Sequence, residues 1–185
     1  MGALRGPTTL PRTCGFRLAL DGQSAIIVAI DRLGAGYLGA YGNSWVETPE
    51  VNQLASQSVL FEQTIADAPV LEWVYRSCWS GAHAMCDGPI ADLPDLPHAA
   101  ALAGISSKLL TDDPRLVDHD LAAGFQWREH LASPVVGEAA ETVERTQMGQ
   151  LFAAAIEWLG RVKSPFLLWV HARAMGGAWD APPEF

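Results

Sequence analysis

Cysteine, charge and long apolar runs are all scarce in this 185-residue chain. Its three cysteines, Cys14, Cys78 and Cys86, form no Cys-x-x-Cys pair, which argues against both a disulfide framework and a zinc cluster. Charged residues make up 18%, and 12 lysines and arginines against 21 aspartates and glutamates give a formal net charge of −9. Because that charge repels phosphate backbones and anionic lipid heads, neither nucleic acid nor a membrane surface is expected as a partner.

The longest apolar run before Asp31 covers residues 25–30, far short of the ~20 residues that a membrane-spanning helix needs. Residues 1–22 carry arginines and are broken by prolines and glycines, so they lack the apolar core of a signal peptide. We therefore expect an irregular leader over residues 1–22, one domain over residues 23–185 and, by default, a cytoplasmic location.

Apolar residues are plentiful: they make up 49% of the chain and include seven tryptophans, enough for a packed core. Apolar blocks or alternating patterns predict strands at 25–30, 58–66, 107–110 and 166–170. Helices are predicted from Thr48-Pro49 onward, over 96–103 and over 142–159. Strands that alternate with helices indicate an α/β fold with a mainly parallel sheet flanked by helices.

Three of the predicted strands end at residues that can carry chemistry, namely Asp31, Asp112 and His171. In open α/β sheets ligands bind at the carboxyl ends of the strands, so these residues are candidates for one site. The alternative is that polar residues simply reach the surface where strands end. The sequence leaves both interpretations open.

Gly34, Gly36 and Gly39 match the Gly-x-Gly-x-x-Gly pattern of dinucleotide-binding turns. Gly42 and Asn43, however, interrupt the helix whose N-terminus should hold the phosphate. A glycine-rich turn without a cofactor is the alternative.

Ser77, Cys78 and Ser80 lie close to His83 in the sequence, as a nucleophile beside a base would. The same small residues also suit ordinary helix packing. The chain contains no His-Glu-x-x-His, Gly-x-Ser-x-Gly or Walker sequence that would favour the catalytic interpretation.

Four stretches of the chain share a further likeness. They are residues 26–42, which end in Leu-Gly-Ala-Tyr-Gly; residues 48–61, which begin Thr-Pro-Glu-Val-Asn-Gln-Leu-Ala; Ala68-Pro69-Val70 followed by Ser80-Gly81; and Ser-Pro-Phe-Leu-Leu-Trp-Val-His at 164–171, followed by Pro182-Pro183. In this order they resemble segments in the N-terminal half of the sulfatase family, in the alkaline-phosphatase superfamily. The likeness covers most of residues 24–185.

The resemblance implies a sulfatase-like α/β domain, truncated relative to the family, and an enzyme that cleaves sulfate esters. Family members use a formylglycine, made from the Cys of Cys-x-Pro-x-Arg, beside a calcium ion. Here the nucleophile position falls on Leu71, which cannot attack sulfur. Arg76 stands one place beyond the position of the motif's arginine, and the resemblance makes it a vestigial catalytic residue. Neither Cys78 nor Cys86 is followed by an arginine four residues later.

The metal ligands that the resemblance implies are altered as well. Where the family has two adjacent aspartates, this chain has Asp31-Arg32. Where the family has Gly-Lys, it has Thr111-Asp112, and of the family's two histidines it keeps the first, as His171, with Gly176 in place of the second. Asp31 is thus a vestigial metal ligand and His171 a vestigial catalytic residue, so we expect no cofactor, although calcium serves the family. We expect the Arg32 guanidinium either to approach the carboxylate of Asp31 or Asp112 in place of a metal or to point into solvent.

Three functions are compatible with these observations. The first is a sulfatase-like protein without catalysis, which keeps a pocket for a sulfated or phosphorylated small molecule or a glycan. The second is a working metal-dependent ester hydrolase or transferase that uses Ser77 with a metal on Asp31 and on Asp112 or Asp113, and the third is a dinucleotide-binding module. Because the sheet would stop after the strand at 166–170, an exposed edge and self-association are also expected.

Overall fold

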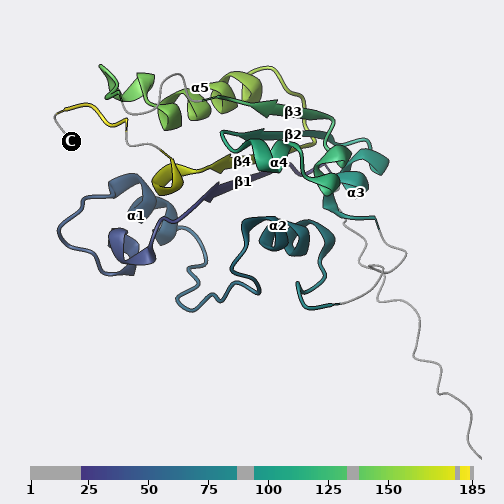
Figure 1. Cartoon of the computed structure of the whole chain (residues 1–185), viewed down its shortest axis with the longest axis horizontal. Coiled ribbons are helices and arrows are strands. Elements are labelled where there is room, and N and C mark those ends of the chain that lie inside the picture. The colour runs from purple at the N-terminus through teal and green to yellow at the C-terminus, as the bar shows by residue number, and fades with distance from the viewer. Residues whose placement is uncertain (1–21, 87–93, 133–137, 178–179, 184–185) are drawn as a thin grey trace, which may run out of the picture.

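The computed structural model describes residues 22–86, 94–132, 138–177 and 180–183. The expected leader, except Gly22, and Cys14 lie outside the described residues. Four strands form a sheet in which all neighbouring pairs are parallel (Figure 1). They are β1 (Ala25–Ile30), β2 (Ser106–Thr111), β3 (Trp127–His130) and β4 (Phe166–Ala172), in the spatial order β1-β4-β2-β3. The predicted α/β fold with a parallel sheet is confirmed.

Helices and shorter turns connect the strands. The α-helices are α1 (Pro49–Ser56), α2 (Leu71–Ser80), α3 (Leu96–Leu102), α4 (Pro114–Val117) and α5 (Gln147–Leu159). The 3-10 turns are η1 (Ala35–Tyr37), η2 (Gly39–Tyr41), η3 (Asp120–Gly124), η4 (Val143–Arg145) and η5 (Ala174–Gly176). In the part of the chain that the structure describes, no helix is both long enough and apolar enough to cross a bilayer.

The central strands β2 and β4 send alternate side chains into two apolar clusters, one on each face of the sheet. Leu109 and Trp169 pack with residues of α2, α3 and η3, whereas Leu110 and Val170 pack with residues of α5. Figure 1 shows α5 and α2 on opposite sides of the sheet. The apolar blocks that predicted these strands are therefore explained by burial on both faces.

The strand predicted over 58–66 is wrong, because this segment has no regular structure. Val59, Phe61 and Ile65, the residues of the expected buried face, are 80%, 70% and 93% exposed. A period of two predicts a strand only when a neighbouring strand pairs with it and one face is covered, and the segment has neither.

The helix predicted over 142–159 begins at Gln147 instead, after the separate turn η4. The Thr146 hydroxyl accepts a hydrogen bond from the Gly149 amide at 3.0 Å and so caps the first turn of α5. The sequence did not predict β3, whose four residues are all exposed. It also assigned no helix to residues 71–80, although the packing interpretation of Ser77, Cys78 and Ser80 fits their place in α2.

Candidate functional site

The carboxyl ends of the parallel strands bring several charged side chains together. Asp31 follows β1, Asp113 follows β2 closely, and Arg173 follows β4. They line a cavity of about 300 Å³ whose lining is completed by Arg32, Pro114, Arg115 and Gly176. Of the three candidate residues at strand ends, Asp31 lines this cavity, while Asp112 and His171 do not.

Asp113 and Arg115 form a closer ion pair than Asp31 and Arg32 do at this edge. The Asp113 side chain is 1% exposed and receives hydrogen bonds from Arg115 Nε and Nη2, the latter at 2.6 Å. Burial alone would raise the pKa of Asp113, but the hydrogen bonds and charge of Arg115 outweigh it and hold this pKa below its ordinary value. Arg115 Nη1 also lies 3.6 Å from Glu72 Oε1 on α2, so one arginine links two elements.

Arg32 lies beside Asp31 rather than beside Asp112. Its Nε is 3.6 Å from Asp31 Oδ2, and its backbone has a φ of +60°, a conformation that non-glycine residues rarely adopt. The Arg32 side chain is 68% exposed, so this pair contributes at most about 1 kcal/mol to stability. Asp112 has another partner, since its Oδ1 accepts the Arg173 amide hydrogen at 2.7 Å.

His171 is buried beneath this edge. The Asp113 amide donates to Thr111 Oγ1 at 3.0 Å, which leaves the Thr111 hydroxyl hydrogen for His171 Nδ1, also at 3.0 Å. This arrangement assigns the proton of the imidazole to Nε2, an atom without a hydrogen-bond partner among the described residues. The Tyr75 ring lies perpendicular to the imidazole at 5.4 Å, and burial lowers the pKa of His171, which favours the neutral ring.

The residue at the expected nucleophile position, Leu71, opens α2 and packs against the apolar cluster on that face. Arg76, one and a half turns later, is exposed and lines none of the cavities described in this chain. Ser77 lies roughly 9 Å of helix away from Leu71. Burial raises the pKa of the Cys78 thiol, which disfavours the reactive thiolate. His83 Nδ1 accepts the Met85 amide hydrogen rather than a hydrogen from Cys78, so the two residues do not form a pair of nucleophile and base through this atom.

The residues present do not fit a calcium ion. The Asp113 carboxylate accepts hydrogen bonds from the Arg115 guanidinium. The Arg32 guanidinium lies beside the Asp31 carboxylate, and the Asp112 carboxylate accepts the backbone amide hydrogen of Arg173. Among the described residues, no group of three or more His, Cys, Asp or Glu side chains could hold a metal. Calcium needs six to eight oxygen ligands, which this edge does not gather.

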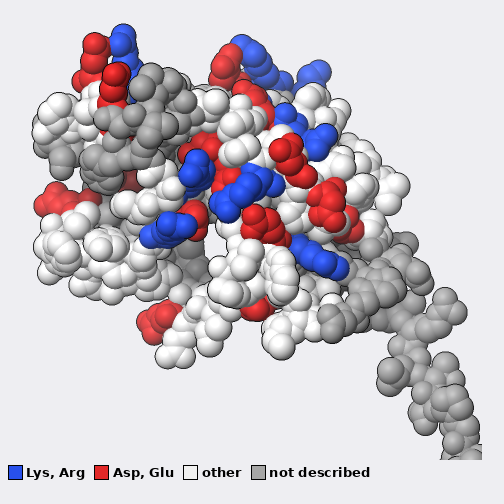
Figure 2. Space-filling model, in the orientation of Figure 1, with Lys and Arg blue, Asp and Glu red and all other residues white. Residues whose placement is uncertain are grey.

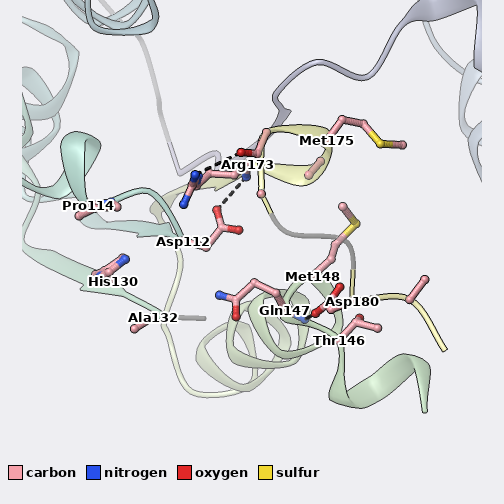
Figure 3. A pocket seen from close by; sticks show the side chains of 14 residues that line it. Asp112, Pro114, His130, Ala132, Thr146, Gln147, Met148, Arg173, Met175 and Asp180 are labelled. Atoms are coloured by element: carbon pink, nitrogen blue, oxygen red, sulfur yellow. Dashed lines mark hydrogen bonds between the residues drawn. The ribbon is translucent and has the colours of Figure 1, made fainter. Parts of the chain in front are cut away.

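A larger cavity of about 690 Å³ adjoins the first and shares Pro114, Arg173 and Gly176 with it (Figure 3). Apolar residues make much of its wall, among them Ala132, Met148 and Met175. In Figure 3, Asp112 and Gln147 point toward the space between the strands and α5. The pair of cavities thus joins a charged compartment to a mainly apolar one.

The glycine-rich turn has a packing explanation. Residues 35–41 form η1 and η2, two 3-10 turns rather than the start of a long helix. A Cβ on Gly39 would lie 2.5 Å from the Asn52 amide nitrogen of α1. The Gly36 carbonyl accepts a hydrogen bond from Asn43 Nδ2, and Gly34 precedes the first turn. The turn therefore presents no helix N-terminus to a dinucleotide phosphate.

Sequence reasoning missed Arg115 and Arg173, which belong to the site by position. Asp113-Pro114 is an N-cap followed by a first-turn proline, and this signal of a helix start places Arg115 in the first turn of α4. Arg173 stands two residues after His171, just beyond the strand. No pattern in the sequence marked either residue as a partner of the aspartates.

No protein-family model matches the chain. Comparison with individual known proteins does find similar sequences and similar folds. Arylsulfatase D of Homo sapiens is 35% identical over 107 residues, which cover 57% of this chain and 18% of that protein. The phosphonate monoester hydrolase of Agrobacterium radiobacter superposes with a TM-score of 0.68 at 20% identity, over 87% of this chain and 42% of that one. The C-terminal periplasmic domain of EcEptC from Escherichia coli gives 0.60 at 11% identity, over 83% and 43%.

The chain thus spans less than half the length of each of these proteins. The two solved structures show the same fold, and the sequence match to arylsulfatase D is a likeness to a sulfatase over part of the chain. The resemblance to the sulfatase family that the sequence predicted is confirmed by this likeness.

Proposed function

We propose that this chain is a sulfatase-like domain that binds sulfate or phosphate monoesters of small molecules without hydrolysing them by the formylglycine route. One observation carries the proposal: three arginine side chains surround a small cavity that continues into a larger apolar one. An organic monoester has the same two parts, an anionic head and an apolar body.

The arginines of the small cavity supply the donors that an oxyanion needs. Arg32, Arg115 and Arg173 line it together with Asp31 and Asp113, and Glu72 and Asp112 lie beside two of these arginines, so directed guanidinium hydrogen bonds rather than a net positive charge would hold the anion. Arg32 is mostly exposed and forms only the 3.6 Å contact with Asp31, so its guanidinium can turn to an oxyanion in bidentate fashion. Sulfate and phosphate esters are also the substrate kind expected from the relationship to sulfatases.

The first turn of α2 supports a domain that does not hydrolyse these esters. Leu71 packs into the apolar cluster and offers no nucleophile, and Ser77 lies at a different level of the helix. Among the described residues, no group of three or more His, Cys, Asp or Glu side chains could hold a metal ion that would activate a hydroxyl or a water. These observations favour ester binding over the rewired hydrolase.

Binding is tested by calorimetric titration of the 185-residue chain with 4-nitrophenyl sulfate and 4-nitrophenyl phosphate. We expect submillimolar dissociation constants and at least roughly tenfold weaker binding of 4-nitrophenol, which lacks the anion. Arg32→Gln should weaken both esters roughly fivefold. Arg161→Gln is the matched control, because Arg161 is exposed, follows the C-terminal end of α5 and pairs with Glu157. Equal binding of the phenol, or an unchanged affinity in Arg32→Gln, would contradict the proposal.

Turnover and metal binding are tested on the same preparation. We expect no release of 4-nitrophenolate with Ca²⁺, Mg²⁺, Mn²⁺ or Zn²⁺, thiols at Cys78 and Cys86 by mass spectrometry, and no rise of Tm in millimolar Ca²⁺. Metal-dependent turnover, an aldehyde at either cysteine, or a calcium-induced rise of Tm would each show that the site works as in an active enzyme.

A further inference from the structure

A third cavity, of about 640 Å³, lies between β2, β3 and α5 and shares no lining residue with the two cavities at the carboxyl edge. Its wall includes Lys108 of β2, Trp127 and Glu129 of β3, and Trp158 near the end of α5. The proposed function makes no use of these residues.

The parallel register explains why these side chains meet. Lys108 pairs with Trp127, and Glu129 stands two residues farther along β3, so all three project from the face that α5 covers. Trp158 descends on them from α5, with its ring centroid 6.2 Å from that of Trp127 and the planes at 67°. Trp127 is 44% exposed, which leaves much of its indole surface open to solvent at the sheet edge.

Lys108 is a buried cation with unused hydrogen-bonding capacity. The residue is 8% exposed, and its ammonium donates to Glu129 Oε2 at 2.6 Å and lies 6.0 Å from the centroid of the Trp158 ring. An ammonium has three N–H donors, and within the described ranges this carboxylate is its one hydrogen-bond acceptor. Glu129 is about half exposed, so its other oxygen remains accessible from the cavity.

We propose that this cleft binds a neutral saccharide, with one sugar ring against Trp127 and its hydroxyls on Glu129 and Lys108. The apolar C–H face of a pyranose suits an exposed indole, while its hydroxyls both accept from an ammonium and donate to a carboxylate. The Lys108–Glu129 pair is neutral as a unit, and Arg128, which also lines the cavity, donates from Nη1 to the Val117 carbonyl at 3.2 Å. The chain as a whole carries −9, so an uncharged ligand fits better than a polyanion. This inference is independent of the ester-binding proposal.

The test is a calorimetric titration of the 185-residue chain with cellohexaose, maltohexaose and chitohexaose. We expect at least one to bind with a Kd of about 1 mM or tighter. Trp127→Ala should weaken that sugar roughly tenfold, because the stacking surface is lost. Glu129→Gln, which keeps the shape and one acceptor, should weaken it by about fivefold.

Trp73→Ala is the matched control, since Trp73 is 56% exposed on α2, away from the cleft. Its sugar affinity should equal that of the wild type. The proposal fails if none of the three sugars binds at 10-fold higher concentration than the expected Kd, or if Trp127→Ala and Glu129→Gln both bind as the wild type does. It also fails if adenosine monophosphate binds in place of the sugars, because that outcome makes the indoles a platform for an aromatic base.

Discussion

Asp113 keeps a negative charge at the base of the candidate site while it is almost fully buried. It accepts the Arg115 amide hydrogen at the start of α4 and a pair of guanidinium hydrogen bonds from the same residue. One carboxylate therefore caps a short helix and fixes the position of Arg115, which lines the small cavity. The described partner of the neighbouring Asp31 is the exposed Arg32, so we expect Asp31 to contribute less to stability than Asp113 does.

Asp113→Asn should destabilise the protein by about 1–3 kcal/mol at pH 7, because the amide cannot accept the same bidentate pair and leaves Arg115 poorly matched. Urea unfolding at constant pH measures this loss. Asp118→Asn is the control, since Asp118 is exposed at the end of the same helix and should stay within about 0.5 kcal/mol of the wild type.

The free energy of unfolding should also depend on pH differently in the wild type and in Asp113→Asn. Because the pKa of Asp113 is lower in the folded than in the unfolded chain, its contribution is complete above the unfolded pKa and is lost as the pH falls through the folded pKa. The stability gap between wild type and Asp113→Asn should therefore narrow as the pH falls below about 4. A gap that stays constant down to pH 2 would show that Asp113 is not ionised in the fold.

At the scale of elements, the sequence predicted those that carry a strong local signal. β1 and β4 were predicted from continuous apolar blocks, of which β4 is buried on both faces and β1 is only partly covered, and Pro49 and Pro97 sit in the first turns of α1 and α3. α2 was missed although Tyr75 and Trp79 are buried. β3 was missed because all four of its residues are exposed and its assignment depends on pairing with β2. Such pairing is a property of tertiary structure that no local pattern records.

The candidate site, like the fold, could be predicted only where a local sequence signal marks its residues. Strand ends pointed to Asp31 and Asp112, since the polarity change after an apolar block is visible in the sequence. The partners of these residues were not visible, because Arg173 approaches Asp112 through its backbone and Arg115 reaches Asp113 within a helix of four residues. The assignment of Leu71 to the nucleophile position came from the resemblance and stays a prediction.

Within the part of the chain that the structure describes, β1 has one edge without a partner strand and one face that no helix covers. It lies at one end of the strand order, and Ile26 and Val28 are 53% and 49% exposed, because α5 packs over β2 and β4 but not over β1. Apolar side chains beside an unpaired edge favour pairing with a second chain.

We expect the wild type to self-associate at about 100 μM and the double variant Ile26→Thr, Val28→Thr to dissociate at least roughly tenfold more easily. Sedimentation velocity over a concentration series distinguishes the two. Leu54→Thr, an equally apolar loss at an exposed position of α1, should leave the association unchanged. A wild type that remains monomeric throughout the series would refute this role of β1.

At the scale of the whole molecule, β4 is the element on which the others depend. It pairs with β1 on one side and β2 on the other, and its side chains enter both apolar clusters. Positive and negative side chains, by contrast, are interleaved across the face that Figure 2 shows and form no single charged region there. Burial around β4, rather than surface charge, therefore holds the fold together.

Leu168→Ala should cost about 2–5 kcal/mol, because Leu168 is fully buried between the sheet and α5. Hydrogen exchange of β1 and β2 amides should accelerate by the same factor in this variant, since both strands lose their partner when β4 opens. Leu54→Ala, at a position that is 67% exposed, serves as the control. Acceleration confined to β4 would mean that the sheet does not open as one unit.

The strand order also determines how long β1 must wait for its partner strand during synthesis of the chain. Ala25 is registered with Leu167 and Ile30 with Ala172, so the partner of β1 is made long after β1 itself. At translation rates of about 5–20 residues per second, the Ala-Ile-Ile-Val-Ala-Ile segment waits on the order of ten seconds outside the ribosome before β4 follows it. During that interval the nascent chain exposes an unpaired, β-branched segment, which makes it a natural client for chaperones that bind apolar peptides.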